Sequence, residues 1–413
     1  MENAAAFAMK QAQRPCPICG AVNVEALHRQ PFVLPEASPL PPTYDVVACG
    51  RCSFVYADTP GNQADYDRYY EEFSKYEDPA VATGGGDSPL DLERIEETAA
   101  LLATHLSDHA RLLDIGCAGG GLLAAMRRRG FTHLLGLDPS PTCIARLTND
   151  GLAGVCGKLS QLAPLEGRKP FDAIVLSHVL EHVVALQESM AALRRMLAPN
   201  GLLYIEVPDG SRYADHPFVP YYYFDSEHIN HFDITSLANL AAVAGFRVLT
   251  CGHRDIPVGE ARTYPAVYAF LTPADGTETV DPAAELRANM IAYIELSHRD
   301  AAFPLLARLV AEDRPIALWG AGSYAQRLLG QSPLAGSRII AVVDRDHNKQ
   351  GRQFAGHTIR APETGLLGLP ANTAVVIANA LHAEAVADEY RALCLTYEIV
   401  QPDKAENRND SGN

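Results

Sequence analysis

The sequence predicts an α/β protein whose main domain is a doubly wound parallel sheet, and three observations lead to this prediction. Residues 111–138 read as strand, glycine-rich turn, helix and second strand. The same order recurs from Ile316, where an apolar run leads into Gly320-Ala321-Gly322. Two Cys-x-x-Cys pairs stand near the amino terminus, ahead of both units. A chain of 413 residues is too long for one ordinary core, so several domains are expected.

The composition is typical of a globular protein, with 47% hydrophobic and 20% charged residues. The formal net charge of −16 repels a phosphate backbone, so nucleic acid is not expected as a partner. The sequence contains neither a long apolar run nor a secretion-signal pattern, which predicts a cytoplasmic protein with no membrane partner. The nine cysteines are too few and too irregular for a disulfide framework. The oligomeric state is left open.

The two cysteine pairs lie within residues 1–60 and predict a structural zinc module, with ligands Cys16, Cys19, Cys49 and Cys52. Each pair can place two thiolates on one tetrahedral ion, and four thiolates close the coordination shell. The stretch between the pairs is rich in proline, which indicates an extended loop. Because so small a module buries little apolar surface, zinc should supply much of its stability.

Residues 61–108 are predicted to form a tyrosine-rich arm and a leading helix. The aromatic rings are interpreted either as packing or as an arm that covers a substrate, with Tyr70 and Tyr76 as candidates for the second role. Ser88 and Pro89 are typical of the start of a helix, which leads into the next domain.

In the main domain, residues 109–275, the acids around the glycine-rich turn indicate the kind of ligand. Asp114 precedes Gly116, Gly119 and Gly120, and Asp138 ends the second strand. Ligands of such sheets bind at the carboxyl ends of the strands, and glycine permits positive φ and close backbone approach. A dinucleotide fold places its acid about 20 residues after its glycines. An acid ahead of them would repel a diphosphate but attract a cation, while Asp138 can hold ribose hydroxyls.

This turn resembles the D-x-G-x-G-x-G motif of class I S-adenosylmethionine-dependent methyltransferases, which have a Rossmann-like fold. Ala118 stands where the second glycine is usual, and slight crowding without loss of binding is expected. Lys158 and Leu159 replace an acid that often binds the adenine, so backbone groups at Leu159 should take that role. Ser177, at the carboxyl end of the next strand, is a further candidate cofactor-binding residue. The alternative interpretation is a structural turn in another α/β protein.

Two histidine-containing segments provide candidate catalytic residues. His178 and His182 follow the strand at 171–176, and imidazole titrates near neutral pH, so either can move protons. Glu227 precedes His228 in a polar and aromatic loop, where the carboxylate can hold the imidazole in one tautomer. Capping of a helix and plain packing of the loop remain the alternatives.

The carboxyl-terminal third is predicted to be a helical linker, residues 276–312, and a second Rossmann-like domain, residues 313–413. The linker should present one apolar face, formed by Ala284, Leu286, Met290, Ile291 and Ile294. Strands are expected at 316–319, 339–343, 374–378 and 397–400. The glycine turn at 320–323 suits a phosphate, but a purely structural domain is an equal alternative.

The three parts in this order resemble the zinc-containing sugar C-methyltransferases, which methylate carbon 3 of nucleotide-linked 4-keto sugars. The marks of this resemblance are the four cysteines, the DIGCAGGG turn, the Glu227-His228 pair with Phe232, and the Trp319–His357 run. The resemblance implies catalytic roles for Glu227, His228, His182 and Tyr76, or Tyr70. The family commonly has a tyrosine where this chain has Asp225, and Tyr222 or Tyr223 is the expected replacement.

The resemblance implies that His228 removes the proton from the carbon next to the ketone, and that the carbanion then attacks the sulfonium methyl group. This mechanism needs no metal at the reacting carbon. O-methylation of a sugar or other small-molecule hydroxyl is the alternative. A binding protein without activity and a dehydrogenase are weaker alternatives, the latter disfavoured by Asp114.

Overall fold

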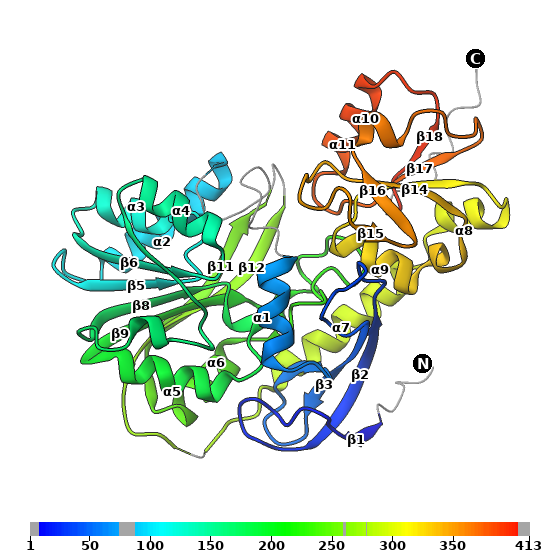
Figure 1. The fold of residues 1–413 in the computed structure, drawn as a ribbon. Coiled ribbons are helices and arrows are strands. Elements are labelled where there is room, and N and C mark those ends of the chain that lie inside the picture. Colours follow the sequence, from blue (N-terminus) through cyan, green and yellow to red (C-terminus); the bar gives the residue numbers. More distant parts are fainter. Residues whose placement is uncertain (1–7, 74–86, 259–261, 278, 404–413) are drawn as a thin grey trace. The chain divides into compact units, whose positions relative to one another are not determined.

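The structure, a computed structural model, describes residues 8–73, 87–258, 262–277 and 279–403 (Figure 1). Its contacts divide the chain into two compact units. The first unit comprises residues 1–27, 45–216 and 227–291, and the second comprises residues 28–44, 217–226 and 292–413. Segments distant in the sequence therefore meet within each unit. The predicted domain boundaries remain predictions.

The first unit contains a seven-stranded sheet in the order β11-β12-β9-β8-β5-β6-β7, which confirms the predicted α/β, Rossmann-like fold. Its neighbouring strands are parallel except for β12, which runs antiparallel to both β9 and β11. The strands are β5 (Arg111–Ile115), β6 (His133–Asp138), β7 (Ala153–Cys156), β8 (Phe171–Ser177), β9 (Leu197–Pro208), β11 (Phe246–Pro257) and β12 (Thr263–Pro273).

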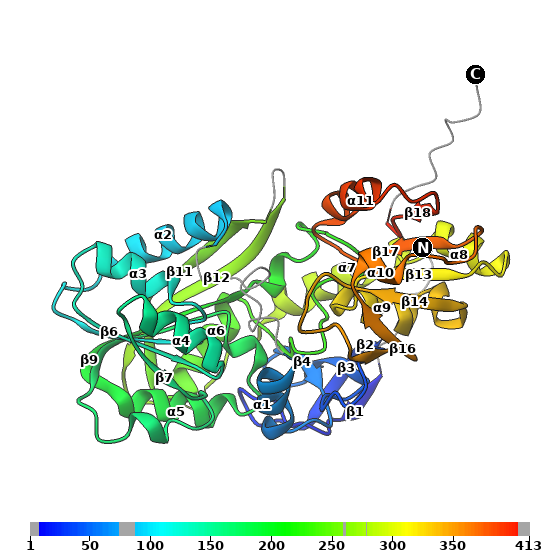
Figure 2. The same cartoon turned by 45° about the horizontal axis from the view of Figure 1, so that its top comes forward.

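Helices cover both faces of this sheet. In Figures 1 and 2, α2, α3 and α4 lie over one face, and α5 and α6 lie over the other. Ser88 accepts a hydrogen bond from the Asp91 N–H group and Pro89 occupies the first turn, as predicted for the start of α2. The helices are α2 (Pro89–Ala103), α3 (Gly121–Arg128), α4 (Pro141–Asn149), α5 (Leu186–Met196) and α6 (Ile234–Val243).

The amino-terminal region forms a five-stranded sheet in the order β1-β2-β3-β4-β10. The prediction of an extended loop between the cysteine pairs is therefore wrong, because β2 and β3 lie there and bury side chains such as Val24 and Val46. Most prolines of this stretch lie in the connection between the two strands. The strands are β1 (Met9–Gln11), β2 (Asn23–Pro31), β3 (Thr43–Cys49), β4 (Val55–Asp58) and β10 (Asn230–His231).

The tyrosine-rich segment forms helix α1 (Gln63–Glu72), which the sequence had not indicated as a helix. Asn62 caps it, and Asp65 completes a reciprocal capping box with the Asn62 backbone. Tyr70 lies in the last turn of α1, whereas Tyr76 lies outside the described residues.

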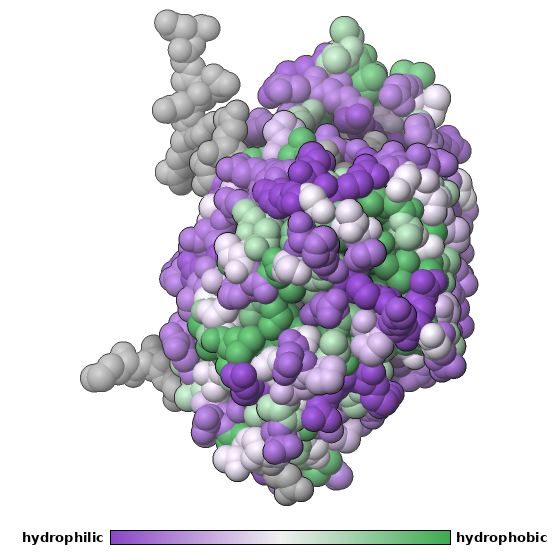
Figure 3. Space-filling model, turned by 90° about the vertical axis from the view of Figure 1, so that its left-hand side faces the viewer, coloured by the Kyte–Doolittle hydropathy of each residue, from purple (hydrophilic) through white to green (hydrophobic). Residues whose placement is uncertain are grey.

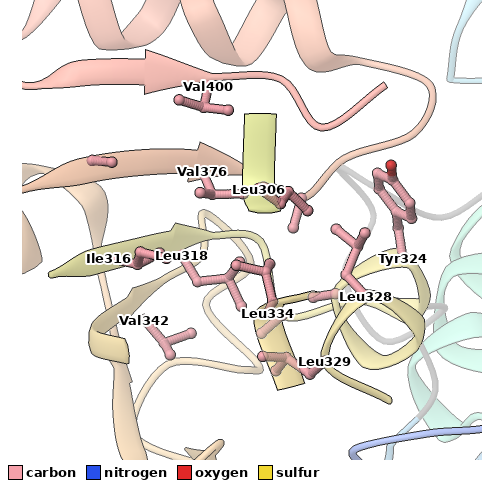
Figure 4. Packing of buried hydrophobic residues seen from close by; sticks show 14 of the residues in the cluster. Leu306, Ile316, Leu318, Tyr324, Leu328, Leu329, Leu334, Val342, Val376 and Val400 are labelled. Atoms are coloured by element: carbon pink, nitrogen blue, oxygen red, sulfur yellow. The ribbon is translucent and has the colours of Figure 1, made fainter. Parts of the chain in front are cut away.

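The second unit contains a six-stranded sheet in the order β15-β16-β14-β13-β17-β18, with only β15 antiparallel to its neighbour. All four predicted strands are present, but the hairpin of β15 and β16 was not predicted. The strands are β13 (Ile316–Trp319), β14 (Ile339–Val343), β15 (Gln353–Phe354), β16 (His357–Arg360), β17 (Ala374–Ile377) and β18 (Glu398–Val400). Figure 4 shows Leu318 and Val376 packing with Leu306 and Leu328 in the core of this unit.

The predicted continuous helical stretch is two helices, because Phe303 adopts a left-handed φ of 42° ahead of Pro304. Leu286, Met290 and Ile294 are buried as predicted, but Ala284 is exposed, so the predicted apolar face is partly wrong. The helices from here on are α7 (Ala284–Asp300), α8 (Pro304–Ala311), α9 (Ser323–Gln331), α10 (Pro362–Gly365) and α11 (Ala383–Ala392). The short 3-10 segments of the chain are η2 (Ala163–Leu165), η3 (Leu180–His182), η4 (Gly210–Arg212) and η5 (Pro333–Gly336).

Figure 3 shows one face of the molecule, on which hydrophilic residues are extensive and hydrophobic residues form smaller patches between them. Within the residues that the structure describes, no helix has both the length and the apolar character needed to cross a membrane.

Candidate active site

The glycine-rich turn connects β5 to α3 at the carboxyl edge of the sheet. Gly116 and Gly120 adopt left-handed φ values of 75° and 83°, and Gly119 lies between them. A Cβ atom on Gly120 would lie 2.1 Å from Leu147 Cδ1, so α4 packs where a side chain would otherwise be. Backbone conformation and close packing therefore both require glycine at position 120.

Ala118 is also in the left-handed region, with φ of 44°. A residue with a Cβ atom pays roughly 1–2 kcal/mol for this conformation. The Ala118 N–H group donates to Asp138 Oδ2 at 2.9 Å, and this bond helps to hold the turn. The departure from the usual glycine therefore places conformational strain in the turn.

Asp138 ends β6 beside this turn and is buried. Its second oxygen, Oδ1, accepts a hydrogen bond from the Ser140 N–H group at 2.9 Å. Two backbone N–H groups thus hold the carboxylate in one orientation. The residue is held rigidly at the position where ribose hydroxyls are expected.

Asp114 lies one strand away, at the end of β5, with only 4% of its surface exposed. Burial, followed by the nearby Asp138 carboxylate, raises the pKa of Asp114 to about 8, and Arg94 opposes this shift. A cation bound beside the two acids would favour the ionised form of Asp114. The electrostatics of the turn therefore suit a cationic ligand.

Leu159 and Ser177 complete the predicted cofactor residues. Leu159 is buried in the loop after β7, where the neighbouring Lys158 forms an ion pair with Glu71 at 2.5 Å. This pair ties the loop to α1. Ser177 ends β8, and its hydroxyl donates to Glu206 Oε1 at 3.1 Å.

Four of the five predicted catalytic residues meet in one cluster, formed by Tyr70, His182, Glu227 and His228. The Tyr70 hydroxyl donates to Glu227 Oε2 at 2.6 Å, and His182 Nδ1 lies 3.0 Å from the Glu227 carbonyl oxygen. The rings of His182 and His228 meet edge to face, with centroids 4.7 Å apart, and Tyr70 packs in the same manner against His182. Tyr76 lies outside the described residues.

The backbone around Asn230 explains why these residues meet. Asn230 Nδ2 donates to the carbonyl oxygens of Leu180 and Val183, at 2.8 and 2.7 Å, and is itself buried. The Ile229 N–H group donates to the Glu181 carbonyl oxygen at 2.8 Å. These bonds fix the loop that carries Glu227 and His228 against η3, which carries His182. A rigid frame of this kind holds catalytic groups in position.

Two buried carboxylates near the cluster, Glu181 and Glu206, were not predicted. Glu206 accepts a hydrogen bond from the Tyr204 hydroxyl and forms an ion pair with Arg254. Burial raises the pKa of Glu206, but the positive charges of Arg254 and His178 outweigh this effect and keep the pKa below its usual value. Glu181 lies 3.3 Å from His178 Nδ1, and His178 adopts a left-handed φ of 56°. A glutamate inside the apolar strand β9 was the available sequence signal for Glu206. Glu181 gave none beyond its histidine neighbours.

The four cysteines gather in the first unit, with their sulfur atoms within 4.8 Å of one another. Sγ of Cys16 lies 3.7 Å from that of Cys52, and Sγ of Cys19 lies 3.5 Å from that of Cys49. Four thiolates at about 2.3 Å from a tetrahedral zinc ion would be about 3.8 Å apart. The arrangement fits a closed, structural zinc site that joins the two pairs.

The glycine turn of the second unit is occupied by its own chain. The Ala321 N–H group donates to Asp344 Oδ2 at 2.8 Å, and Lys349 pairs with the same carboxylate at 3.2 Å. A Cβ atom on Gly320 would lie 2.7 Å from the Ala378 carbonyl oxygen, so close packing accounts for this glycine. These contacts favour the structural interpretation of the turn.

Comparison with known proteins identifies the main domain. Residues 91–250 match a family model described as a methyltransferase domain. The match includes the glycine-rich turn, both of its acids and the Glu227-His228 pair, so the chain contains a methyltransferase domain of the α/β, Rossmann-like class. Tyr70 and the four cysteines lie outside the matched residues.

Among curated proteins, the chain is similar to a ubiquinone biosynthesis O-methyltransferase from Hahella chejuensis, at 36% identity over 28% of this chain and 48% of that protein. It is also similar to a trans-aconitate 2-methyltransferase from Methylobacterium nodulans, at 34% identity over 30% of this chain and 48% of that protein. The chain spans less than half the length of these curated relatives.

Among solved structures, the chain is similar to a didemethyltoxoflavin methyltransferase from Burkholderia thailandensis, at 20% identity, with a TM-score of 0.37 over 53% of this chain and 95% of that one. It is also similar to a magnesium protoporphyrin IX methyltransferase from Synechocystis, at 13% identity, with a TM-score of 0.38 over 52% of this chain and all of that one.

Proposed function

We propose that this chain is an S-adenosylmethionine-dependent methyltransferase that methylates a carbon atom of a nucleotide-linked keto sugar. The observation that carries the proposal is the cluster of Tyr70, His182, Glu227 and His228. The sugar itself is inferred from the resemblance of the chain to zinc-containing sugar C-methyltransferases. The methyltransferase domain supports the coarser part of the proposal.

The turn between β5 and α3 is suited to hold the cofactor. Asp114 would face the cationic amino-acid end of S-adenosylmethionine, and Asp138 would accept hydrogen bonds from the ribose hydroxyls. Gly116 and Gly120 give the turn its left-handed backbone conformation, and Val179 and Leu147 pack where their Cβ atoms would be. When bound, the cofactor supplies an electrophilic methyl group on a positively charged sulfur atom.

His228 is the proposed base of the reaction. A ketone on the neighbouring carbon acidifies the C–H bond of the substrate, and the imidazole of His228 accepts that proton. The electron pair left on carbon then forms the new bond to the methyl group, while the carbon–sulfur bond breaks. The Tyr70 hydroxyl donates its single proton to Glu227 Oε2, and on substrate binding this proton would turn to the enolate oxygen.

Asp225 distinguishes this chain from the family that it resembles. Within the second unit, its carboxylate lies 3.8 Å from the Arg327 guanidinium group, an arrangement that a tyrosine would not reproduce. Tyr223 is buried, whereas Tyr222 is partly exposed and lies under Arg327. Both tyrosines belong to the second unit, and the choice between them stays a prediction. The change at position 225 favours a sugar different from those of the family.

The second candidate function is O-methylation of a sugar or another small-molecule hydroxyl. The names of several curated relatives, among them ubiquinone biosynthesis O-methyltransferases, favour it. The same His228 would then accept the proton of the hydroxyl group. Both reactions require one base near the transferred methyl group, so the site supports each of them.

A labelled-methyl assay tests the proposal. Protein that carries zinc on its four cysteines, with no excess zinc, is incubated with isotopically labelled S-adenosylmethionine and a panel of nucleotide-linked keto sugars, and methyl transfer is read by mass. His228→Ala should abolish the product and leave cofactor affinity nearly unchanged. His109→Ala is the matched control, because the side chain of His109 is 87% exposed and lies outside the cluster. Undiminished turnover by His228→Ala would remove His228 as the base.

Deuterium oxide separates the two candidate reactions. A base that forms an enolate should exchange the substrate's carbon-bound hydrogen for deuterium, even with S-adenosylhomocysteine in place of the methyl donor. Exchange that His228→Ala abolishes supports methylation at carbon. A methylated product formed without such exchange supports methylation at oxygen.

Two further outcomes would contradict both candidates. Tight cofactor binding without turnover on any substrate would indicate a binding protein, and tight binding of a nicotinamide dinucleotide would indicate a dehydrogenase. Structural zinc at the four cysteines and a cytoplasmic location complete the proposal.

A further inference from the structure

We propose that Glu181, His182 and His228 form a second metal site, which binds a divalent transition ion such as Zn²⁺. Their ligand atoms lie within 4.8 Å of one another at the carboxyl edge of the sheet. Two imidazoles and one carboxylate are the protein ligands of open zinc sites, where a fourth position stays accessible. This site differs from the cysteine cluster, whose four thiolates close the shell.

The hydrogen bond of His182 orients it as a metal ligand. Its Nδ1 lies 3.0 Å from the Glu227 carbonyl oxygen, which can only accept, so Nδ1 carries the proton. In a neutral imidazole Nε2 then presents its lone pair, and this atom lies 3.7 Å from Glu181 Oε1. Metal-binding histidines commonly donate their other N–H group to a carbonyl oxygen in this manner.

The Glu181 carboxylate provides the second, independent observation. It is 1% exposed, and within the residues that the structure describes neither of its oxygens has a hydrogen-bond partner. His178 Nδ1 lies 3.3 Å away but makes no hydrogen bond with it. A buried carboxylate without a hydrogen-bond partner is costly, and a cation between Glu181 and His182 would satisfy a lone pair on each of them.

The distance between the Glu181 and His182 ligand atoms requires only a small adjustment. Donor atoms at about 2.0–2.1 Å from a tetrahedral zinc ion are about 3.4 Å apart, and the Glu181–His182 pair is already at 3.7 Å. Asn230 and the Ile229 N–H group fix the two ligand-bearing segments against each other. The partly buried His228 closes the site from the opposite segment.

Occupancy of this site has a consequence that rests on the proposed function. One lone pair of His228 cannot both bind a metal ion and accept a proton. A bound Zn²⁺ ion would therefore inhibit methyl transfer, and excess zinc would act as a regulator of the same site.

Metal binding can be measured without any substrate. Protein that already carries zinc on its four cysteines is equilibrated with Co²⁺, and bound metal is counted by elemental analysis. The wild type should bind one additional equivalent, with visible d–d bands but no new thiolate-to-cobalt charge-transfer band. Glu181→Gln and His228→Asn should each weaken this binding by about 100-fold or more, whereas His109→Ala should not.

Folding and activity provide two further measurements. Glu181→Gln should fold, because glutamine has nearly the same shape as glutamate and removes a buried charge. Added Zn²⁺ should raise the melting temperature of the wild type but not that of this variant. Zinc should also inhibit wild-type turnover. One metal equivalent in total, or equal binding by Glu181→Gln, would overturn the site. Turnover that rises with zinc would overturn the inhibitory role. If no substrate is methylated, the binding result still decides the site.

Discussion

Replacement of Asp114 by asparagine tests the electrostatics of the cofactor turn. Asparagine has nearly the same shape but cannot ionise, so the variant removes a titration and leaves the packing of β5 intact. Burial and the neighbouring Asp138 raise the pKa of Asp114 to about 8 in the folded protein, from an ordinary value of 3.8. The folded state therefore holds a proton that the unfolded state releases at lower pH.

The sign of the effect follows from this difference. Between pH 3.8 and about 8 the folded state binds more protons than the unfolded state, so stability falls as pH rises through this range. Two such pKa values imply that the free energy of unfolding falls by about 3–4 kcal/mol between roughly pH 5 and pH 8. This figure is an upper bound, because residual structure in the unfolded state reduces it. Asp114→Asn should lack this loss.

The same titration should control binding of the cofactor. A cationic ligand prefers ionised Asp114, so S-adenosylmethionine should release a proton on binding, and its affinity should rise about eightfold between roughly pH 6.5 and pH 7.5. Asp114→Asn should bind with an affinity independent of pH in this range. It should also bind about 10- to 100-fold more weakly at high pH, because a charge-assisted hydrogen bond is lost.

Denaturant unfolding across pH and calorimetry in buffers of different ionisation enthalpy measure the two effects. Asp108→Asn is the matched control, because the Asp108 side chain is 60% exposed. If apo Asp114→Asn keeps the pH dependence of the wild type, the carboxyl group is not shifted. If both proteins gain affinity equally with pH, Asp114 does not contact the cation.

Three other variants test the turn, the zinc module and the cluster. Ala118→Gly should raise the free energy of unfolding by about 1 kcal/mol, because it removes the strain of the left-handed conformation. Ala124→Gly within α3 should instead lower it by about 1 kcal/mol. Equal effects of the two variants in denaturant unfolding would contradict the presence of strain at Ala118. Cys49→Ser, or zinc removal by a chelator, should lower the melting temperature measured by calorimetry by several degrees, whereas Cys156→Ser should not. Zinc that elemental analysis still finds in Cys49→Ser would argue against the site. Tyr70→Phe should keep ring packing on His182 and cofactor affinity but lower turnover at least tenfold in the labelled-methyl assay; unchanged turnover would exclude the hydroxyl.

Local sequence signals were sufficient for the elements and for the cofactor turn. Apolar runs followed by Gly116 or Gly320 predicted strand, turn and helix, because such patterns act over a few neighbouring residues. The spacing of the cysteine pairs likewise predicted their grouping. The strands β2 and β3 were missed, because the prolines that connect them dominated the pattern of the whole stretch.

The tertiary structure decided the chemistry of the site. His228 lies against His182 because β10 pairs with β4 and Asn230 binds the η3 carbonyl groups, and no local spacing encodes these contacts. The left-handed conformation of Ala118 and the buried Glu181 carboxylate are equally products of packing. Sequence patterns report what neighbours along the chain prefer. Desolvation and the orientation of lone pairs depend on what distant segments place around them.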